Sequence, residues 1–236
     1  QRQMCIRDRS FLQQCYNIAD TLIVGQCIGA GALAAVGSAY TLMVFLISVL
    51  LGLAMGSGTV FSLHYGAGNY VALRRSIFSS FVLIGIVTLI LNVAVFIWLG
   101  PILRLLQVPQ DIYGMMHSYL WIIFCGIVFT FIYNFYASLL RAVGDSVTPL
   151  WFLAVSVVLN IALDLFFILQ LDWGIQGAAA ATVLAQGVAA LGIIIYTYRR
   201  RPELRWHHED MCFDRTCLKE IASFSTPVSY THLRAH

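Results

Sequence analysis

A carboxylate, an amide and a hydroxyl share one face of a strongly apolar segment. In the run WFLAVSVVLNIALDLFFIL, Ser156, Asn160 and Asp164 follow one another at steps of four residues, which places them on one side of a helix. An Asp near the centre of a bilayer costs about 2.5–3.5 kcal/mol to insert, so such a residue is usually functional. Carboxylate, amide and hydroxyl oxygens suit a hard cation such as Na⁺, and a carboxylate can also hold a proton. The spacing therefore predicts a cation or proton site inside a membrane.

A second acid and a further polar face lie in other apolar segments. Asp20, in YNIADTLIVG, is followed by 53 residues without any Asp, Glu, Lys or Arg, and Tyr16 precedes it by one helical turn. Thr182 and Gln186 are also one turn apart, within the small-residue stretch GAAAATVLAQG. These faces present oxygen ligands at the depth of the membrane, as the face with Asp164 does.

The alternative is that these side chains only hold helices together. Hydrogen bonds between membrane helices contribute about 0.6 kcal/mol on average, which would not offset the cost of burying an acid. A functional site is therefore the better interpretation for Asp20 and Asp164. Asn160 and Thr182 could equally be structural, and the ring of Tyr16 could simply pack in the core.

The composition indicates a membrane protein. Hydrophobic residues make up 60% of the chain and charged residues 11%, whereas a soluble domain carries roughly 25% charge. The net charge of +3 comes from arginines that flank apolar runs, which disfavours nucleic-acid binding. HExxH, GxSxG and P-loop motifs are absent from the sequence, so no catalytic set suggests an enzyme and no cofactor is expected.

The apolar runs are continuous and predict transmembrane helices rather than the alternating strands of a barrel. We expect an all-α membrane protein with a bundle of six transmembrane helices. The predicted spans cover about residues 11–29, 38–65, 77–99, 113–140, 149–171 and 175–198. Gly144 is expected to close the fourth span in a left-handed conformation, and Thr148 to cap the fifth, with Pro149 at its first position. Pro101 is expected just past the third span.

Loop charges and the two ends complete the predicted organisation. Arginines follow the second, fourth and sixth spans, which by the positive-inside rule places these loops and both ends of the bundle in the cytoplasm of a plasma (inner) membrane. Residues 1–9 and 228–236 resemble translated sequencing-adapter read-through, and we expect both segments to be non-native. Between them we expect a six-helix lobe over 10–198, a cytoplasmic linker over 199–216 and the start of a truncated seventh helix over 217–227.

Three stretches carry a family resemblance. YNIADTLIVGQCIGAGALAAVGSA, HYGAGNYVALRRS and LLRAVGDSVTPLWFLAVSVVLNIALDLFFI resemble the multidrug and toxic compound extrusion (MATE) transporters, and the likeness covers nearly all of residues 11–226. The resemblance implies one six-helix lobe of a twelve-helix antiporter that exports amphipathic, often cationic, compounds against Na⁺ or H⁺. The second lobe of the same polypeptide, the lipid bilayer and the exported compound would be its partners.

The resemblance also implies the ligands of the coupling ion. They fall on Asp20, Asn160, Asp164 and Thr182, with Tyr16 as a nearby aromatic ligand, and these four positions are the possible Na⁺ site. The first helix of the family often carries a proline that permits bending, and the decamer QRQMCIRDRS replaces that stretch here. A lipid-linked oligosaccharide flippase of the same superfamily is the first alternative function. A membrane-embedded enzyme, or a scaffold, is the alternative from another class.

Overall fold

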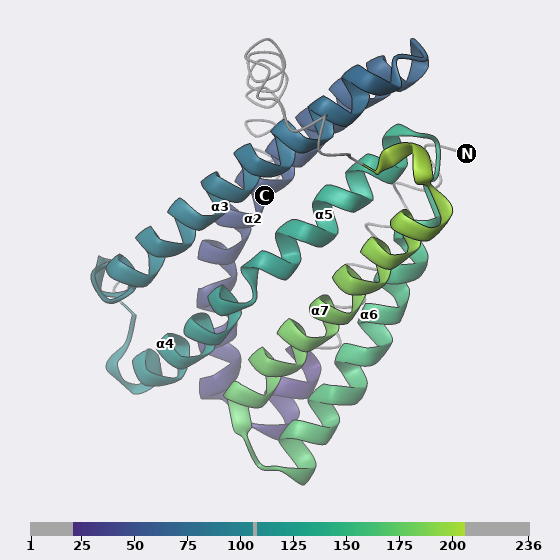
Figure 1. The fold of residues 1–236 in the computed structure, drawn as a ribbon. Coiled ribbons are helices and arrows are strands. Elements are labelled where there is room, and N and C mark those ends of the chain that lie inside the picture. The colour runs from purple at the N-terminus through teal and green to yellow at the C-terminus, as the bar shows by residue number, and fades with distance from the viewer. Residues whose placement is uncertain (1–20, 106–107, 206–236) are drawn as a thin grey trace. The chain divides into compact units, whose positions relative to one another are not determined.

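The structure is a computed structural model that describes residues 21–105 and 108–205. Every regular element in these ranges is a helix (Figure 1). The α-helices are α2 (Ala30–Gly66), α3 (Tyr70–Leu105), α4 (Gln110–Cys125), α5 (Ile127–Ala142), α6 (Val147–Leu165) and α7 (Gly174–Arg200). A π-helical segment, Phe166–Gln170, continues α6, and a 3-10 turn, Pro202–Leu204, follows α7. The predicted all-α architecture is confirmed.

The long helices have the dimensions of membrane spans. Within the described ranges, α2, α3, the segment Val147–Gln170 and α7 are each long and apolar enough to cross a bilayer, and the bent pair α4–α5 would make a fifth crossing. The first predicted span lies mostly outside the described residues, apart from a helical stretch over residues 21–27. The predicted segments 1–9, 217–227 and 228–236, and most of the predicted linker, also lie outside them.

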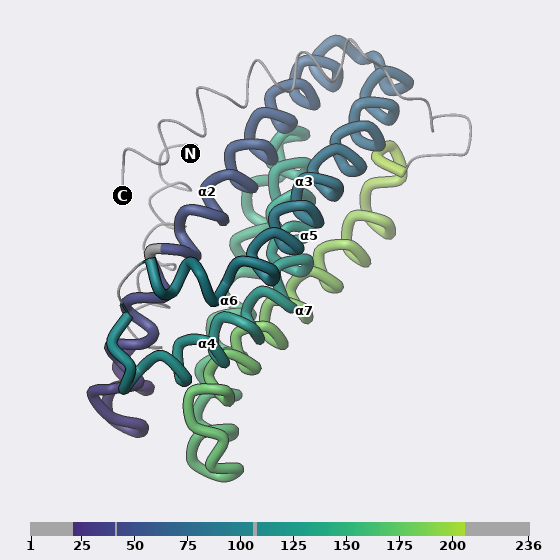
Figure 2. Tube along the Cα trace, turned by 90° about the vertical axis from the view of Figure 1, so that its left-hand side faces the viewer, coloured from purple at the N-terminus to yellow at the C-terminus, as the bar shows by residue number. Residues whose placement is uncertain are grey.

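The chain forms two compact units. Of the described residues, unit 1 comprises 21–44, 91–105, 108–130 and 150–189, and unit 2 comprises 45–90, 131–149 and 190–205. In unit 2 the second half of α2 and the first half of α3 form an antiparallel pair joined by a short turn at Gly68 (Figures 1 and 2). In unit 1 the C-terminal part of α6 and the N-terminal part of α7 lie side by side (Figure 2). The candidate polar residues of α6 and α7 belong to this second pairing.

Three predicted loops are shorter than expected because helices continue into them. The segment expected to connect the first and second spans is helical from Ala30, since its alanines and leucines favour a helix. The helix is interrupted just before it, at Gly29, where φ is +116°. Helix α3 extends beyond the predicted 77–99 in both directions and contains Pro101. At about 1.5 Å per residue, its 36 residues exceed the roughly 30 Å of a hydrocarbon core, so its ends can project into water.

The fourth predicted span is not one straight helix. It divides at Gly126 into α4 and α5, which meet at an angle of 46°. The fifth and sixth predicted spans agree with the structure, apart from the π-helical end of α6 and the extension of α7 to Arg200. Asp172 and Gly174, at φ 53° and 55°, make the sharp connection between α6 and α7.

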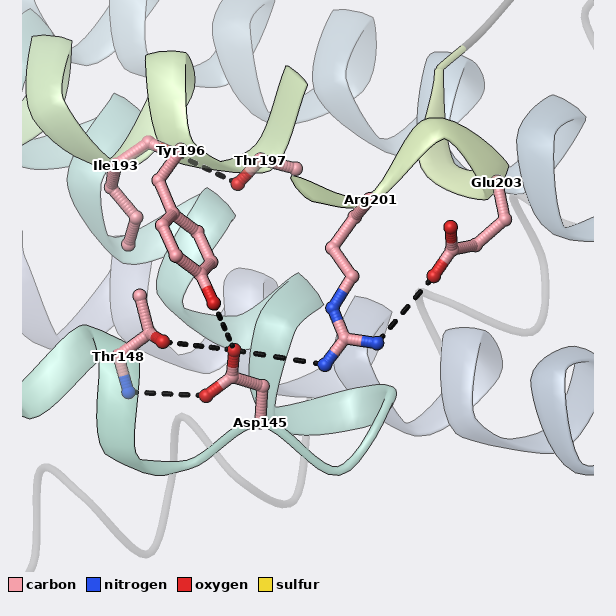
Figure 3. Close-up of polar contacts among 7 residues, drawn as sticks. All are labelled: Asp145, Thr148, Ile193, Tyr196, Thr197, Arg201 and Glu203. Carbon is pink, nitrogen blue, oxygen red and sulfur yellow. Dashed lines mark hydrogen bonds and ion pairs between the residues drawn. The ribbon is translucent and has the colours of Figure 1, made fainter. Parts of the chain in front are cut away.

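The turn from α5 to α6 has the expected glycine but not the expected cap. Gly144 is at φ +90°, and the Asp145 N–H donates to the Leu140 carbonyl at 2.9 Å, which closes α5 as predicted. The cap of α6 is Asp145 rather than Thr148 (Figure 3). Its carboxylate accepts the Thr148 N–H at 3.1 Å and the Thr148 hydroxyl at 2.9 Å. The predicted cap was therefore three residues too late, and α6 begins at Val147, before Pro149.

The same carboxylate also holds the end of α7. Tyr196 donates its hydroxyl to Asp145 at 3.2 Å, and Arg201 approaches Asp145 at 3.7 Å and Glu203 at 3.6 Å (Figure 3). Asp145 is only 10% exposed, whereas Arg201 and Glu203 are each 30% exposed. One carboxylate therefore joins the α5–α6 turn to the C-terminal turn of α7 within unit 2.

We expect Asp145→Ala to lower the free energy of unfolding by about 1–2 kcal/mol, because it removes a helix cap together with the Tyr196 bond. Glu203→Gln is the matched control, since it affects only a partly exposed ion pair worth at most about 1 kcal/mol. Unfolding in mixed micelles of increasing SDS content, followed by circular dichroism, measures the free energy of unfolding of both variants. An equal decrease in the two variants would contradict a capping role for Asp145.

Candidate functional site

Asn160, Asp164 and Thr182 come together in unit 1. Asn160 and Asp164 lie on α6 and Thr182 lies on the facing side of α7. Asn160 and Asp164 are fully buried, and Thr182 is 7% exposed. Two of these polar residues sit one turn apart on α6, as their spacing in the sequence required. The third comes from a segment 18 residues further along the chain.

The amide of Asn160 bridges its two neighbours. When its nitrogen faces the acid, it donates to Asp164 Oδ2 at 3.2 Å, and its oxygen accepts the Thr182 backbone N–H at 3.3 Å. The opposite orientation would leave oxygen facing oxygen, so we assign this one. The amide atom on the Thr182 side also lies 3.3 Å from the Thr182 hydroxyl. Asn160 therefore connects the carboxylate on α6 to the backbone and side chain of α7.

The oxygen atoms of this cluster are of the kind that a cation or a proton can bind. An ionised carboxylate removed from water is costly unless a cation, a proton or several donors compensate it. Asn160 supplies one neutral donor to Asp164, and Thr182 offers a hydroxyl oxygen beside the same amide. A carboxylate, an amide and a hydroxyl in a buried position are the donor set that Na⁺ accepts, and the carboxylate alone suits a proton.

The other two predicted ligands, Tyr16 and Asp20, lie outside the described residues, so their participation stays a prediction. Ser156, on the same face of α6, is buried at 9% exposure. Gln186, one turn beyond Thr182 on α7, accepts a hydrogen bond from the hydroxyl of Thr130 on α5, also within unit 1.

Two polar residues of unit 1 that make contacts between helices were not predicted from the sequence. Asn92, on α3, is 9% exposed and donates its amide N–H to the Phe124 carbonyl at 3.0 Å, at the end of α4. Thr130 contacts Gln186 from the first turn of α5. The signal for Asn92 was a single amide in the apolar run LILNVAVF, which by itself does not indicate a partner.

Clusters suited to a transition metal are absent from residues 21–105 and 108–205, where no three His, Cys, Asp or Glu side chains gather. His117 instead stacks on Tyr113, with ring centroids 6.2 Å apart. Asn160, Asp164 and Thr182 are the described part of the cation site predicted from the sequence.

Comparison with known proteins places the chain among transporters. The profile of the MatE family matches residues 9–166. The chain is 36% identical over 190 residues to the probable multidrug resistance protein YpnP of Bacillus subtilis, covering 80% of this chain and 43% of that protein. It is 33% identical over 199 residues to the probable multidrug resistance protein YoeA of Bacillus subtilis, covering 83% and 43%. The chain thus spans less than half the length of these curated relatives.

The fold is likewise that of a solved transporter. An outward-facing structure of a multidrug resistance MATE transporter of the MOP superfamily superposes with a TM-score of 0.90 and 24% identity, covering 98% of this chain and 51% of that one. The resemblance seen in the sequence is confirmed, and the members of this family are membrane transporters rather than enzymes. On the profile match over residues 9–166, the chain belongs to the MatE family, the multidrug and toxic compound extrusion transporters.

Proposed function

We propose that this chain is one lobe of a secondary antiporter that exports amphipathic organic compounds in exchange for Na⁺ or H⁺. The observation that carries the proposal is the fully buried Asp164, bonded through the Asn160 amide to Thr182. A buried acid with neutral oxygen neighbours has its charge neutralised reversibly by a cation or a proton. The multidrug names of the relatives favour a drug-like substrate over a lipid-linked oligosaccharide.

The site can couple an ion to a conformational change through the helices that carry it. Because Asp164 is on α6 and Thr182 on α7, a cation held by both would favour the arrangement in which the two helices lie close together. A ligand shifts a conformational equilibrium only by its differential affinity for the two states. Export would follow if the coupling ion and the organic compound prefer opposite-facing states. Asp20 and Tyr16, in the first predicted span, would complete the ligand set.

The orientation in the membrane is part of the same proposal. Arg199, Arg200 and Arg201 follow the sixth predicted span, and the positive-inside rule places this end of α7 in the cytoplasm. The lobe would then sit in the inner membrane, and its partner would be a second lobe of the same transporter, reached through the segment after α7.

We expect the complete transporter, in proteoliposomes, to export ethidium when one ion gradient is imposed. One arm imposes a Na⁺ gradient at constant pH, and the other imposes a pH gradient without Na⁺. Export driven by either gradient supports the proposal and identifies the coupling ion. Ethidium movement that is identical with and without both gradients would rule out an ion-coupled antiporter.

A further inference from the structure

We propose that Gly126 positions the Thr182 side of the candidate ion site, by admitting Val183 of α7 into the break between α4 and α5. The inference rests on the proposed function only for its consequence on ion binding. The packing itself belongs to unit 1 and is independent of what the site holds. Gly126 is a positioning residue here, since it acts on the site through α7 and does not reach the ligands.

The glycine is required by space rather than by backbone conformation. Gly126 has φ −86° and ψ −6°, which any residue can adopt. A Cβ at this position would lie 2.4 Å from Val183 Cγ2, 2.7 Å from Cγ1 and 3.0 Å from Cβ. Ordinary contacts between carbon atoms begin at about 3.5 Å, so a side chain at residue 126 must displace Val183, and α7 moves with it unless the break shifts instead. Small residues commonly allow such close approach of membrane helices.

Helix α7 is held on two sides at this level. Thr182 and Val183 are consecutive and therefore point in directions about 100° apart on the helix. Thr182 contacts Asn160 of α6, while Val183 fills the space left by Gly126. One turn further along, Gln186 contacts Thr130 of α5. The position of Thr182 relative to α6 thus depends on how closely α7 approaches the α4–α5 break.

The end of α4 is held by a hydrogen bond from α3, so we expect a larger side chain at residue 126 to displace α7 rather than α4. The Phe124 carbonyl, which lies at the end of α4, accepts the amide N–H of Asn92 from α3 at 3.0 Å. The Gly126 N–H bonds the Ile122 and Ile123 carbonyls at 3.3 and 3.0 Å. The bond from α3 anchors the end of α4 independently of α7. A methyl group at residue 126 is therefore expected to move α7, and the 3.3 Å contact of Thr182 with Asn160 has little margin before it exceeds hydrogen-bond distance.

The first arm of the test measures this geometry by cross-linking, with the 236-residue chain in nanodiscs. Cysteines are placed by Asn160→Cys and Thr182→Cys in a background without the native cysteines. Oxidation should form the disulfide rapidly in the parent. With Gly126→Ala the rate should be at least about fivefold lower, because a disulfide tolerates little increase in the distance between its two cysteines. Adding Val183→Gly removes the clashing side chain and should restore the parent rate. Gly114→Ala is the matched control, since a Cβ at Gly114 of α4 meets nothing within 4 Å.

Equal cross-linking rates in the parent and in Gly126→Ala would overturn the inference, as would a parent pair that fails to cross-link. Slowing that Val183→Gly does not reverse would also overturn it, because the clash would not be the cause.

The second arm measures binding of radioactive Na⁺ with Asn160 and Thr182 intact. Gly126→Ala should weaken binding about tenfold, with recovery in the Val183→Gly double variant and no change in Gly114→Ala. A parent that binds no Na⁺ while the cross-linking pattern holds would contradict the Na⁺ form of the proposed function and still support the packing inference. Unchanged Na⁺ affinity in Gly126→Ala, with normal binding in the parent, would overturn the positioning role.

Discussion

Asp164→Asn should abolish ion-driven drug export by the complete transporter while membrane insertion and abundance stay at the parent level. The substitution preserves the size of the side chain and an amide oxygen but removes the charge that would hold Na⁺ or exchange a proton. Asp164 is fully buried, so its neutral replacement lowers the cost of insertion and should not impair folding. The measurement is ethidium efflux from cells, normalised to transporter abundance in isolated membranes.

Arg200→Gln is the control for Asp164→Asn at matched expression. Arg200 is the last residue of α7 and is exposed, so its replacement should leave efflux close to that of the parent. If both variants exported equally well, Asp164 would be structural. Any coupling would then have to lie in the part of the transporter that this chain does not contain.

Asn160→Ala should weaken binding of the coupling cation about tenfold and also reduce stability in the absence of the ion. Its amide donates to Asp164 and accepts from Thr182, so the truncation removes one neutral ligand and the bond that stabilises the carboxylate. A hydrogen bond to a charged group contributes about 1.5–3 kcal/mol, which sets the scale of both losses. Binding of radioactive Na⁺ and SDS-induced unfolding measure the two effects separately.

Thr182→Val provides the comparison for Asn160→Ala. It keeps the shape of the side chain and the backbone N–H that Asn160 accepts, and it removes only the hydroxyl at 3.3 Å. We expect a smaller loss of cation affinity than in Asn160→Ala. An Asn160→Ala protein that binds Na⁺ as tightly as the parent would show that the amide only holds the helices together.

Local properties of the sequence were sufficient for the class of fold and for the α6 part of the site. Long apolar runs can satisfy their backbone hydrogen bonds in a membrane only as helices, so the all-α architecture followed from composition and run length. The period of the helix placed Asn160 and Asp164 on one face, since residues four apart are neighbours on any helix. Gly144 at the end of α5 was predictable for the same reason, because a left-handed cap depends on one residue.

The other features depend on contacts between residues that are far apart in the sequence, and these contacts could not be predicted from it. The α4–α5 break at Gly126 lies against Val183, 57 positions later, and the end of α4 beside it is bonded by Asn92, 34 positions before Gly126. The cap of α6 is Asp145, a carboxylate that also contacts Tyr196 of α7 and Arg201 just after α7. Thr182 became a neighbour of Asn160 only once two helices had packed together. Helical period specifies which side chains share a face, whereas the identity of the facing helix and its closeness of approach arise from packing between elements.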